Sequence, residues 1–220
     1  MTEEPLPVAA TVVLVRDGAA GPEVLMLRRP DRGSFAAAWV FPGGKLEERD
    51  YAEAGADADE LAVSRLAAVR ETHEEVGLHV AADALVPLSR WVPPQHTTLR
   101  IRTWFFVAPA PAGEIVPQPS EVDEYAWLSP LEALQRHGRG ELILWPPTWV
   151  TLWGLSDQAD AASALAEARL NGLVRFDTEF AAGGKVVRWA GDEEHSDAGA
   201  PGARHRLTTD ALPWIYTRSR

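Results

Sequence analysis

The sequence predicts an α+β fold in which helices cover a mixed sheet. Short β-rich runs alternate with stretches of helical spacing along most of the 220 residues. This alternation lacks the strict strand–helix–strand repeat of a parallel sheet, so an α/β/α sandwich with a mixed sheet is expected. With 46% apolar residues, the chain is long enough for one domain, or for one domain with an extension.

The first half of the chain predicts two paired strands, a short third strand and a long helix. Asp17-Gly18 and Gly21-Pro22 separate the first two apolar runs, a pattern typical of a turn. A loop follows, and the third strand runs into Pro42-Gly43-Gly44. The predicted strands span residues 8–15, 23–28 and 39–41, and the helix spans about 60–76.

The second half predicts more strands, then helices and a distinct tail. Ser129, Pro130 and Glu132 form a strong helix start, with a capping side chain, a proline at the first position and an acid in the first turn. We expect a tail at 1–7, a domain at 8–172 and a hairpin-like extension at 173–220. Strands are predicted at 85–91, 99–108, 122–128, 185–189, 204–208 and 214–216, and a further helical stretch at about 147–170, broken near 156–157.

The most informative segment is the acidic run within the long helix. Glu71, Glu74 and Glu75 stand at i, i+3 and i+4, so their carboxylates share one helix face. Three such carboxylates repel each other unless a cation lies between them, and a hard divalent cation prefers oxygen ligands. Gly77 follows where a left-handed helix cap is needed.

A solvated acidic face is the competing interpretation for any one of these glutamates. The joint pattern is harder to dismiss, because Arg70, the three glutamates and Gly77 fix five positions. At about 6% average usage per residue, this is a chance event of roughly one in a million per start position. For Gly43 and Gly44 the competing interpretation is a simple turn.

These residues resemble the Nudix box, in which a glycine and a glutamate precede Arg-Glu-x-x-Glu-Glu-x-Gly. Gly44 takes the place of the first glycine, but Asp50 stands where the family has glutamate. Nineteen residues separate Asp50 from Arg70 instead of the family's seven, so the box (44–78) carries a twelve-residue insertion at about 51–62. Thr72 occupies an aliphatic position of the box. The insertion is expected to be a solvated loop or an extra helical turn.

A long-box branch of the family, the peroxisomal-type coenzyme A diphosphatases, shares such an insertion. Further similarity to this branch lies downstream, so the resemblance covers about residues 8–155. The similar segments are Arg90–Pro94, Arg102–Ala108, Glu121 before Trp127, and Pro146-Pro147-Thr148 before Leu152.

The resemblance implies a Mg²⁺- or Mn²⁺-dependent hydrolase that cleaves the pyrophosphate bond of a nucleoside diphosphate linked to another moiety. Coenzyme A or an acyl-CoA is the favoured substrate class, with ADP-ribose and dinucleotides left open. The implied metal ligands are Gly44, Glu71, Glu74 and Glu75. The expected catalytic residues are Arg70, an orienting residue, and a general base, with Glu74 first and Glu121 or Glu124 second.

Other candidates are weighed against ordinary structural roles. Arg28, Lys45 and Arg102 are expected to bind substrate phosphates, with a solvated surface role as the alternative for each arginine. Glu47 and Glu48 are alternatives to Asp50 as partners of Arg70. The aromatic residues Trp39, Trp91, Trp104 and Phe106 suit a core better than base stacking. His73, His79 and His96 lack metal-binding spacing and are expected to be structural or exposed.

Composition limits the partners and the location. A net charge of −11 argues against nucleic acid, and the absence of cysteine excludes disulfides and fits a reducing cytoplasm. Neither a membrane span nor an N-terminal signal peptide is expected, so we predict a cytoplasmic protein with a small-molecule partner. The oligomeric state stays open, a homodimer included.

A non-catalytic Nudix module that binds a nucleotide-like ligand for regulation is the rival function. Degenerate modules usually lose box carboxylates, and this chain keeps all three, which favours the enzyme.

Overall fold

The structure is a computed structural model that describes residues 6–33, 35–95, 97–181 and 183–219. Two predictions fall outside these ranges: the absence of a signal peptide at residues 1–5, and the role of His96. The helices are α1 (Glu48–Ala54), α2 (Glu60–Val76), α3 (Pro130–Gly138), α4 (Pro146–Leu155) and α5 (Ala161–Asn171), with a single 3₁₀ turn at Ala82–Ala84. The strands are β1 (Val8–Gly18), β2 (Gly21–Arg28), β3 (Trp39–Val40), β4 (Gly43–Lys45), β5 (Val86–Val92), β6 (Arg102–Pro109), β7 (Glu124–Leu128), β8 (Val174–Asp177), β9 (Glu179–Phe180), β10 (Val186–Arg188), β11 (His205–Thr208) and β12 (Ile215–Arg218).

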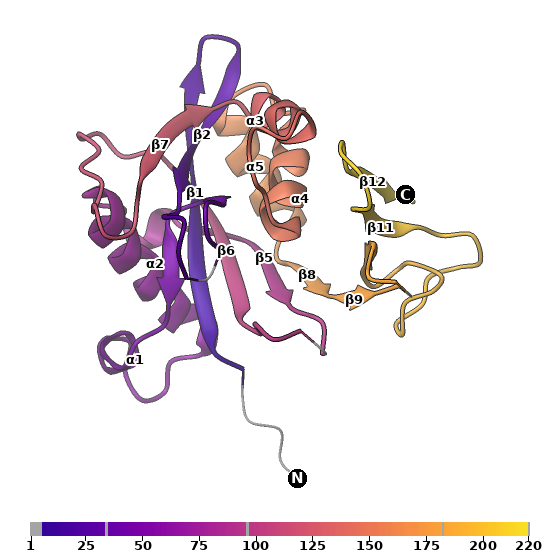
Figure 1. Cartoon of the computed structure of the whole chain (residues 1–220). Helices are drawn as coiled ribbons and strands as arrows, with labels where there is room; N and C mark the ends of the chain where they lie inside the picture. Colours follow the sequence, from indigo (N-terminus) through magenta and orange to yellow (C-terminus); the bar gives the residue numbers. More distant parts are fainter. Residues whose placement is uncertain (1–5, 34, 96, 182, 220) are drawn as a thin grey trace.

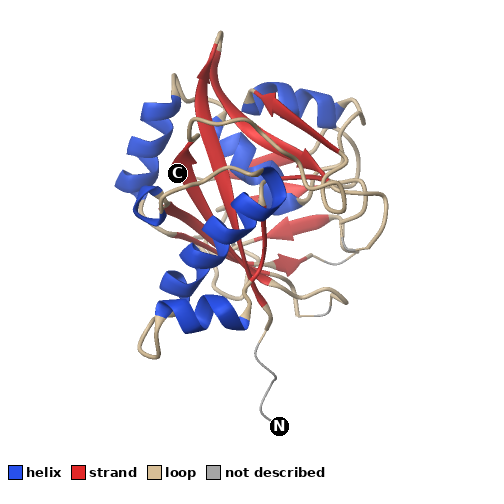
Figure 2. Ribbon diagram, turned by 90° about the vertical axis from the view of Figure 1, so that its left-hand side faces the viewer, coloured by secondary structure: helices blue, strands red, loops and turns tan. Residues whose placement is uncertain are grey.

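Among the described residues, the larger sheet contains eight strands. Six follow the order β3-β2-β1-β6-β5-β8, while β4 pairs with β1 and β7 pairs with β2. The β1–β6 and β5–β8 pairs are parallel and the other pairs are antiparallel, so the predicted mixed sheet is confirmed. The long β1–β2 hairpin projects beyond the rest of the sheet (Figure 1 and Figure 2).

Helices cover both faces of this sheet, as the α/β/α prediction requires (Figure 1). Side chains alternate along β1, so Val12 and Leu14 join the core under α2, whereas Val13 joins the core under α3, α4 and α5. Two apolar cores therefore lie on opposite sides of the sheet. The candidate aromatic residues Trp39, Trp91, Trp104 and Phe106 are buried in these cores, as predicted.

The long helix α2 has the ends that the sequence predicts. The Asp59 side chain accepts a hydrogen bond from the Ala62 amide at 2.8 Å and caps the first turn. Gly77 takes the left-handed conformation (φ 72°) at the other end, and its amide donates to the His73 carbonyl. Thr72 is fully buried, and its hydroxyl donates to the Ala68 carbonyl one turn back, which satisfies the polar group.

The insertion is partly helical. α1 begins at Glu48, before the inserted residues, because Glu47 and Asp50 form a capping box at its start. The turn after α1 contains Gly55 with φ 90°, and Asp59 then starts α2. The prediction of an extra helical turn is therefore correct for the first part of the insertion, and its last residues belong to α2.

Two strands begin later than predicted. β6 starts at Arg102 instead of residue 99, because its partner β1 starts at Val8 and offers no earlier pairing. β7 starts at Glu124 instead of residue 122, because the Val122 amide donates to the Gln118 carbonyl in a turn.

The extension predicted from residue 173 contacts the domain closely. Its first strand, β8, pairs with β5 in the larger sheet, and β9 to β12 form a second, antiparallel sheet. Val187 and Leu207 of this second sheet, and Trp189 directly after β10, belong to the same core as Trp91. In the described part of the chain, no helix is both long and apolar enough to span a membrane.

Candidate active site

The Gly-Gly segment forms β4, which lies beside the carboxylates of α2. A Cβ atom added to Gly44 would lie 2.3 Å from the Glu71 Oε1 atom, so a side chain has no room there. The Gly43 amide donates to Glu75 Oε2 at 2.8 Å. The close approach to Glu71 thus depends on glycine at position 44, whereas a Cβ atom on Gly43 would lie 2.3 Å from the Ala10 carbonyl oxygen of β1.

Three carboxylates converge on one point next to β4. Oxygen atoms of Glu71, Glu75 and Glu121 all lie within 4.8 Å of one another. The Glu75 side chain is 1% exposed and that of Glu71 is 12% exposed. Burial raises the pKa of Glu75 to about 8, against the opposing effects of the Gly43 amide and of Arg29, whose Nη1 donates to Glu75 Oε1 at 3.0 Å. Burial likewise raises the pKa of Glu71.

This cluster fits a divalent cation. Buried carboxylates that share a site disfavour their charged forms until a positive charge is placed between them. The ligand atoms are all carboxylate oxygens, which are the donors that Mg²⁺ and Mn²⁺ prefer.

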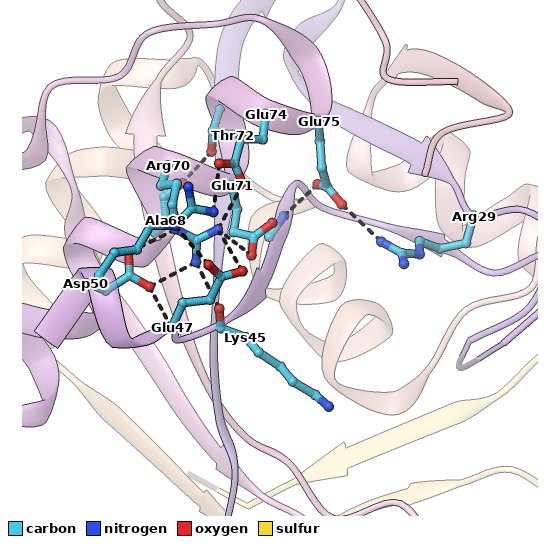
Figure 3. Close-up of polar contacts among 12 residues, drawn as sticks. Arg29, Lys45, Glu47, Asp50, Ala68, Arg70, Glu71, Thr72, Glu74 and Glu75 are labelled. Carbon is cyan, nitrogen blue, oxygen red and sulfur yellow. Dashed lines mark hydrogen bonds and ion pairs between the residues drawn. The ribbon is translucent and has the colours of Figure 1, made fainter. Parts of the chain in front are cut away.

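Arg70 holds the site together (Figure 3). Its guanidinium donates to both Asp50 carboxylate oxygens, to Glu71 Oε1, to Glu74 Oε2 and to the Lys45 carbonyl, each at 2.9 Å. The hydrogen bonds to Asp50, ahead of those to Glu71 and Glu74, raise the pKa of Arg70, so the group stays charged. Burial alone would raise the pKa of Asp50, but the hydrogen bonds from Arg70 and from the Glu47 amide hold it below its usual value. Asp50 is thus the bidentate partner of Arg70, while the Glu47 carboxylate lies farther from Arg70, at 3.8 Å.

The structure separates Glu74 from the other predicted ligands. Its side chain is 40% exposed. One of its oxygens accepts a hydrogen bond from Arg70, and the other forms an ion pair with Arg49, each at 2.9 Å. Glu121, a predicted general base, instead belongs to the three-carboxylate cluster. Glu124 is exposed and lies opposite Arg28 in the β2–β7 pair, outside this cluster.

The arginines predicted to bind substrate already have acidic partners. Arg28 pairs with Asp123 at 3.4 Å, and Arg102 pairs with Glu60 at 2.6 Å. Lys45 has no acidic partner among the side chains that the structure describes.

Neither the contact of Arg29 with Glu75 nor that of Arg49 with Glu74 was predicted from the sequence. Strand alternation contains the signal for Arg29: Leu25 and Leu27 face α2, so Arg29 continues the same face and reaches Glu75. Arg49 contacts Glu74 because α1 packs beside α2, and no local sequence pattern predicts that packing.

A cavity of about 650 Å³ lies away from the carboxylate cluster. It is bounded by α4, α5, β5, β8 and β12, and none of the clustered carboxylates lines it. Its walls include Trp153 and Tyr216, the latter from the C-terminal sheet.

Comparison with known proteins places this geometry in a family. Residues 5–145 match the NUDIX domain family. The crystal structure of a NUDIX hydrolase from Alicyclobacillus acidocaldarius aligns with 26% identity and a TM-score of 0.66, over 75% of this chain and 97% of that chain. A MutT NUDIX hydrolase from Burkholderia pseudomallei shares the fold, with 20% identity and a TM-score of 0.52 over 68% of this chain and 98% of that chain. No curated protein matches the sequence. Because the family match spans well over half of the chain and includes β4 and α2, the chain belongs to the Nudix family, and it is a Nudix hydrolase that acts on phosphorus-containing anhydrides.

Proposed function

We propose that the protein cleaves the pyrophosphate bond of a nucleoside diphosphate linked to a second moiety, and that this reaction depends on Mg²⁺ or Mn²⁺. The convergence of Glu71, Glu75 and Glu121 beside the Gly-Gly strand carries this proposal. The products are a nucleoside monophosphate and a phosphorylated remainder.

Glu71, Glu75 and Glu121 would hold the cation, with Gly44 and Glu74 as the additional ligands that the Nudix pattern suggests. When bound, the cation supplies positive charge that neutralises the diphosphate oxygens as the bond to the leaving group breaks. Arg70 keeps Glu71 and Glu74 in place through its hydrogen bonds, and it acts as an orienting residue.

The hydrogen bonds favour Glu121 over Glu74 as the general base. A base needs a free carboxylate oxygen to accept a proton from the attacking water. One Glu74 oxygen accepts a hydrogen bond from Arg70 and the other forms an ion pair with Arg49, so both are already engaged. None of the described side chains donates to the Glu121 carboxylate, so one of its oxygens would stay free when the other ligates the cation. Glu124 lies outside the cluster and is the weakest of the three candidates.

Coenzyme A or an acyl-CoA is the proposed substrate class, because the twelve-residue insertion and the downstream segments resemble the long-box coenzyme A diphosphatases. ADP-ribose and dinucleotides are the alternatives. The cytoplasmic location and the homodimer stay predictions.

A substrate panel tests the proposed function. Coenzyme A, acetyl-CoA, ADP-ribose and NADH are incubated with the protein in Mg²⁺, in Mn²⁺ and in excess chelator, and the products are separated by chromatography. Only with metal do we expect cleavage, which releases adenosine 3′,5′-bisphosphate from coenzyme A and acetyl-CoA, and AMP from ADP-ribose and NADH. Glu75→Gln should lower kcat at least 100-fold, because comparable electrostatic groups contribute roughly 3–4 kcal/mol at a transferring phosphoryl group.

Glu124→Gln is the matched control, since Glu124 is exposed and outside the carboxylate cluster. Ligand binding without turnover of any substrate, in wild-type protein with either metal, would favour the rival regulatory module. Full activity of Glu75→Gln would remove the carboxylate cluster from the mechanism.

A further inference from the structure

We propose that a pocket next to β4 recognises an anionic group, a phosphomonoester, on the part of the substrate remote from the bond that is cleaved. The pocket has a volume of about 330 Å³. Its polar walls are Lys45, Tyr51, Glu60 and Arg102. This inference rests on the proposed function, which it deepens by naming the chemistry that selects among nucleoside diphosphate derivatives.

The pocket adjoins the catalytic carboxylates through two chain segments. Lys45 directly follows Gly44, and its carbonyl accepts a hydrogen bond from Arg70, which also binds Glu71. Tyr51 directly follows Asp50, the bidentate partner of Arg70. A substrate held at the carboxylates therefore has the pocket within reach of its remote moiety.

The charge of the pocket suits an anion. Lys45 is exposed and has no acidic partner among the described side chains, and its side chain extends away from the carboxylates (Figure 3). Both Glu60 oxygens are already engaged, one by Arg102 at 2.6 Å and the other by the Trp104 indole N–H at 2.7 Å. The positive charges of Lys45 and Arg102 outnumber the single negative charge of Glu60, so the pocket is net positive in a chain of net charge −11.

The size and the remaining walls restrict what the pocket holds. A volume of 330 Å³ is at the low end for small-molecule sites, so it accommodates a sugar phosphate rather than a whole dinucleotide. The half-exposed Tyr51 ring and Leu46 offer apolar contact to the sugar, and the Tyr51 hydroxyl is an additional hydrogen-bond donor.

Two of the four polar walls come from the insertion. Tyr51 lies in α1, whose capping box fixes the helix start, and Glu60 is the first residue of α2. The insertion therefore builds the pocket, which gives it a role in substrate choice beyond that of a spacer.

Two substrate pairs that differ by a single phosphomonoester test the inference. The first pair is coenzyme A and 3′-dephospho-coenzyme A, and the second is NADPH and NADH. For each pair we measure the ratio of kcat/KM, phosphorylated over unphosphorylated, for the wild type, Lys45→Met and Tyr51→Phe. Lys185→Met is the matched control, because Lys185 is the only other lysine in the chain and is exposed in the C-terminal extension.

We expect the wild type to prefer the phosphorylated member of at least one pair. Lys45→Met should reduce that ratio about tenfold, equivalent to about 1.4 kcal/mol, through KM. Lys185→Met should keep the wild-type ratio. The substrate pair whose ratio falls in Lys45→Met shows whether the pocket binds the 3′-phosphate of coenzyme A or the 2′-phosphate of NADPH. A wild type without preference in either pair, or ratios that Lys45→Met leaves within twofold, would overturn the inference.

A binding measurement separates this inference from the proposed function. If the wild type hydrolyses none of the four compounds, the proposed function fails. Calorimetry then tests, without any turnover, whether the pocket binds a phosphomonoester. Adenosine 3′,5′-bisphosphate, adenosine 2′,5′-bisphosphate and AMP are titrated into each variant. Tighter binding of a bisphosphate than of AMP, lost in Lys45→Met but kept in Lys185→Met, supports the pocket, and equal binding refutes it.

Discussion

Asp50 meets two requirements with one carboxylate. It accepts both hydrogen bonds from Arg70, and it also accepts the Glu47 amide at the start of α1. Its side chain is shorter than the glutamate of the Nudix pattern, but α1 brings its backbone close enough to α2 to compensate. The sequence left Glu47 and Glu48 as alternatives, because the path of the nineteen residues between Asp50 and Arg70 cannot be deduced from spacing alone.

Asp50→Asn should destabilise the protein and reduce its activity. The change removes one partner of a mostly buried pair, in which the Arg70 side chain is 12% exposed, and leaves the Arg70 charge partly uncompensated. Loss of such a partner costs about 3 kcal/mol. Urea denaturation at pH 7 measures the change, with the exposed Asp83→Asn as control. A free energy of unfolding within 0.5 kcal/mol of wild type, a typical surface effect, would contradict the role of the pair.

The choice of general base gives a second prediction at the residue scale. Glu121→Gln should lower kcat at least 100-fold, because general base catalysis commonly contributes 10²–10⁴-fold. Glu74→Gln should lower kcat less, since both Glu74 oxygens already contact arginines. Steady-state kinetics at pH 7 with saturating metal compares the two variants. A larger loss of kcat in Glu74→Gln than in Glu121→Gln would return the role of general base to Glu74.

At the scale of elements, local patterns predict α2 well and α1 poorly. Asp59 and Gly77 mark the ends of α2 in the sequence, and the observed helix lies between them. α1 is shorter, and it is stabilised by contacts with α2 and by the Asp50–Arg70 pair. Removal of residues 51–62 would take away the Asp59 cap and the Glu60 partner of Arg102, so the insertion supports the fold as well as the pocket.

Asp192 is a buried anchor of the C-terminal sheet. Its carboxylate is fully buried and accepts hydrogen bonds from the Arg206 guanidinium and from the amides of His205 and Glu194. Burial alone would raise the pKa of Asp192, but these hydrogen bonds, with that of Arg206 the largest, hold it well below its usual range. No local pattern in the sequence indicates this anchor, because Asp192 binds His205 and Arg206 of β11 across a glycine-rich segment.

Asp192→Asn should cost about 3 kcal/mol of stability at pH 7, since Arg206 loses its buried partner. The pKa of Asp192 is lower in the folded than in the unfolded state, so its contribution is complete above the unfolded value of about 3.9. It disappears as the pH falls through the folded value. Urea denaturation from pH 7 to pH 3 should therefore show a difference from wild type that narrows in acid. The exposed Asp197→Asn is the control, and a pH-independent difference would contradict this assignment.

At the scale of the molecule, the sequence predicts the order and type of the elements but not their long-range pairing. Periodicity and turn residues place β1, β2 and α2 within a few residues. The parallel pairing of β1 with β6 joins segments about ninety residues apart, and nothing in either strand encodes its partner. The same limit applies to the carboxylates: Glu71 and Glu75 are neighbours by helix geometry, whereas Glu121 reaches them from a turn that only the folded chain places there.

The C-terminal sheet shares its core with the catalytic domain, so the two should unfold together. Trp189 is fully buried, packs edge-on against Trp91 and Phe176 at centroid distances of 5.6 and 5.5 Å, and donates its indole N–H to Thr178. Trp189→Ala should therefore destabilise the whole molecule by about 3–5 kcal/mol.

Circular dichroism in the near and far ultraviolet, followed during urea denaturation, measures whether one transition reports both parts. We expect coincident transitions in the wild type and in Trp189→Ala, both moved to lower urea in the variant. The more conservative Trp189→Phe should lose less stability, because it keeps most of the ring contacts. Two results would contradict a shared core: separate near- and far-ultraviolet transitions in Trp189→Ala, or a wild-type urea midpoint in a chain that ends at Asp177. Either result would show that the C-terminal sheet does not stabilise the catalytic domain.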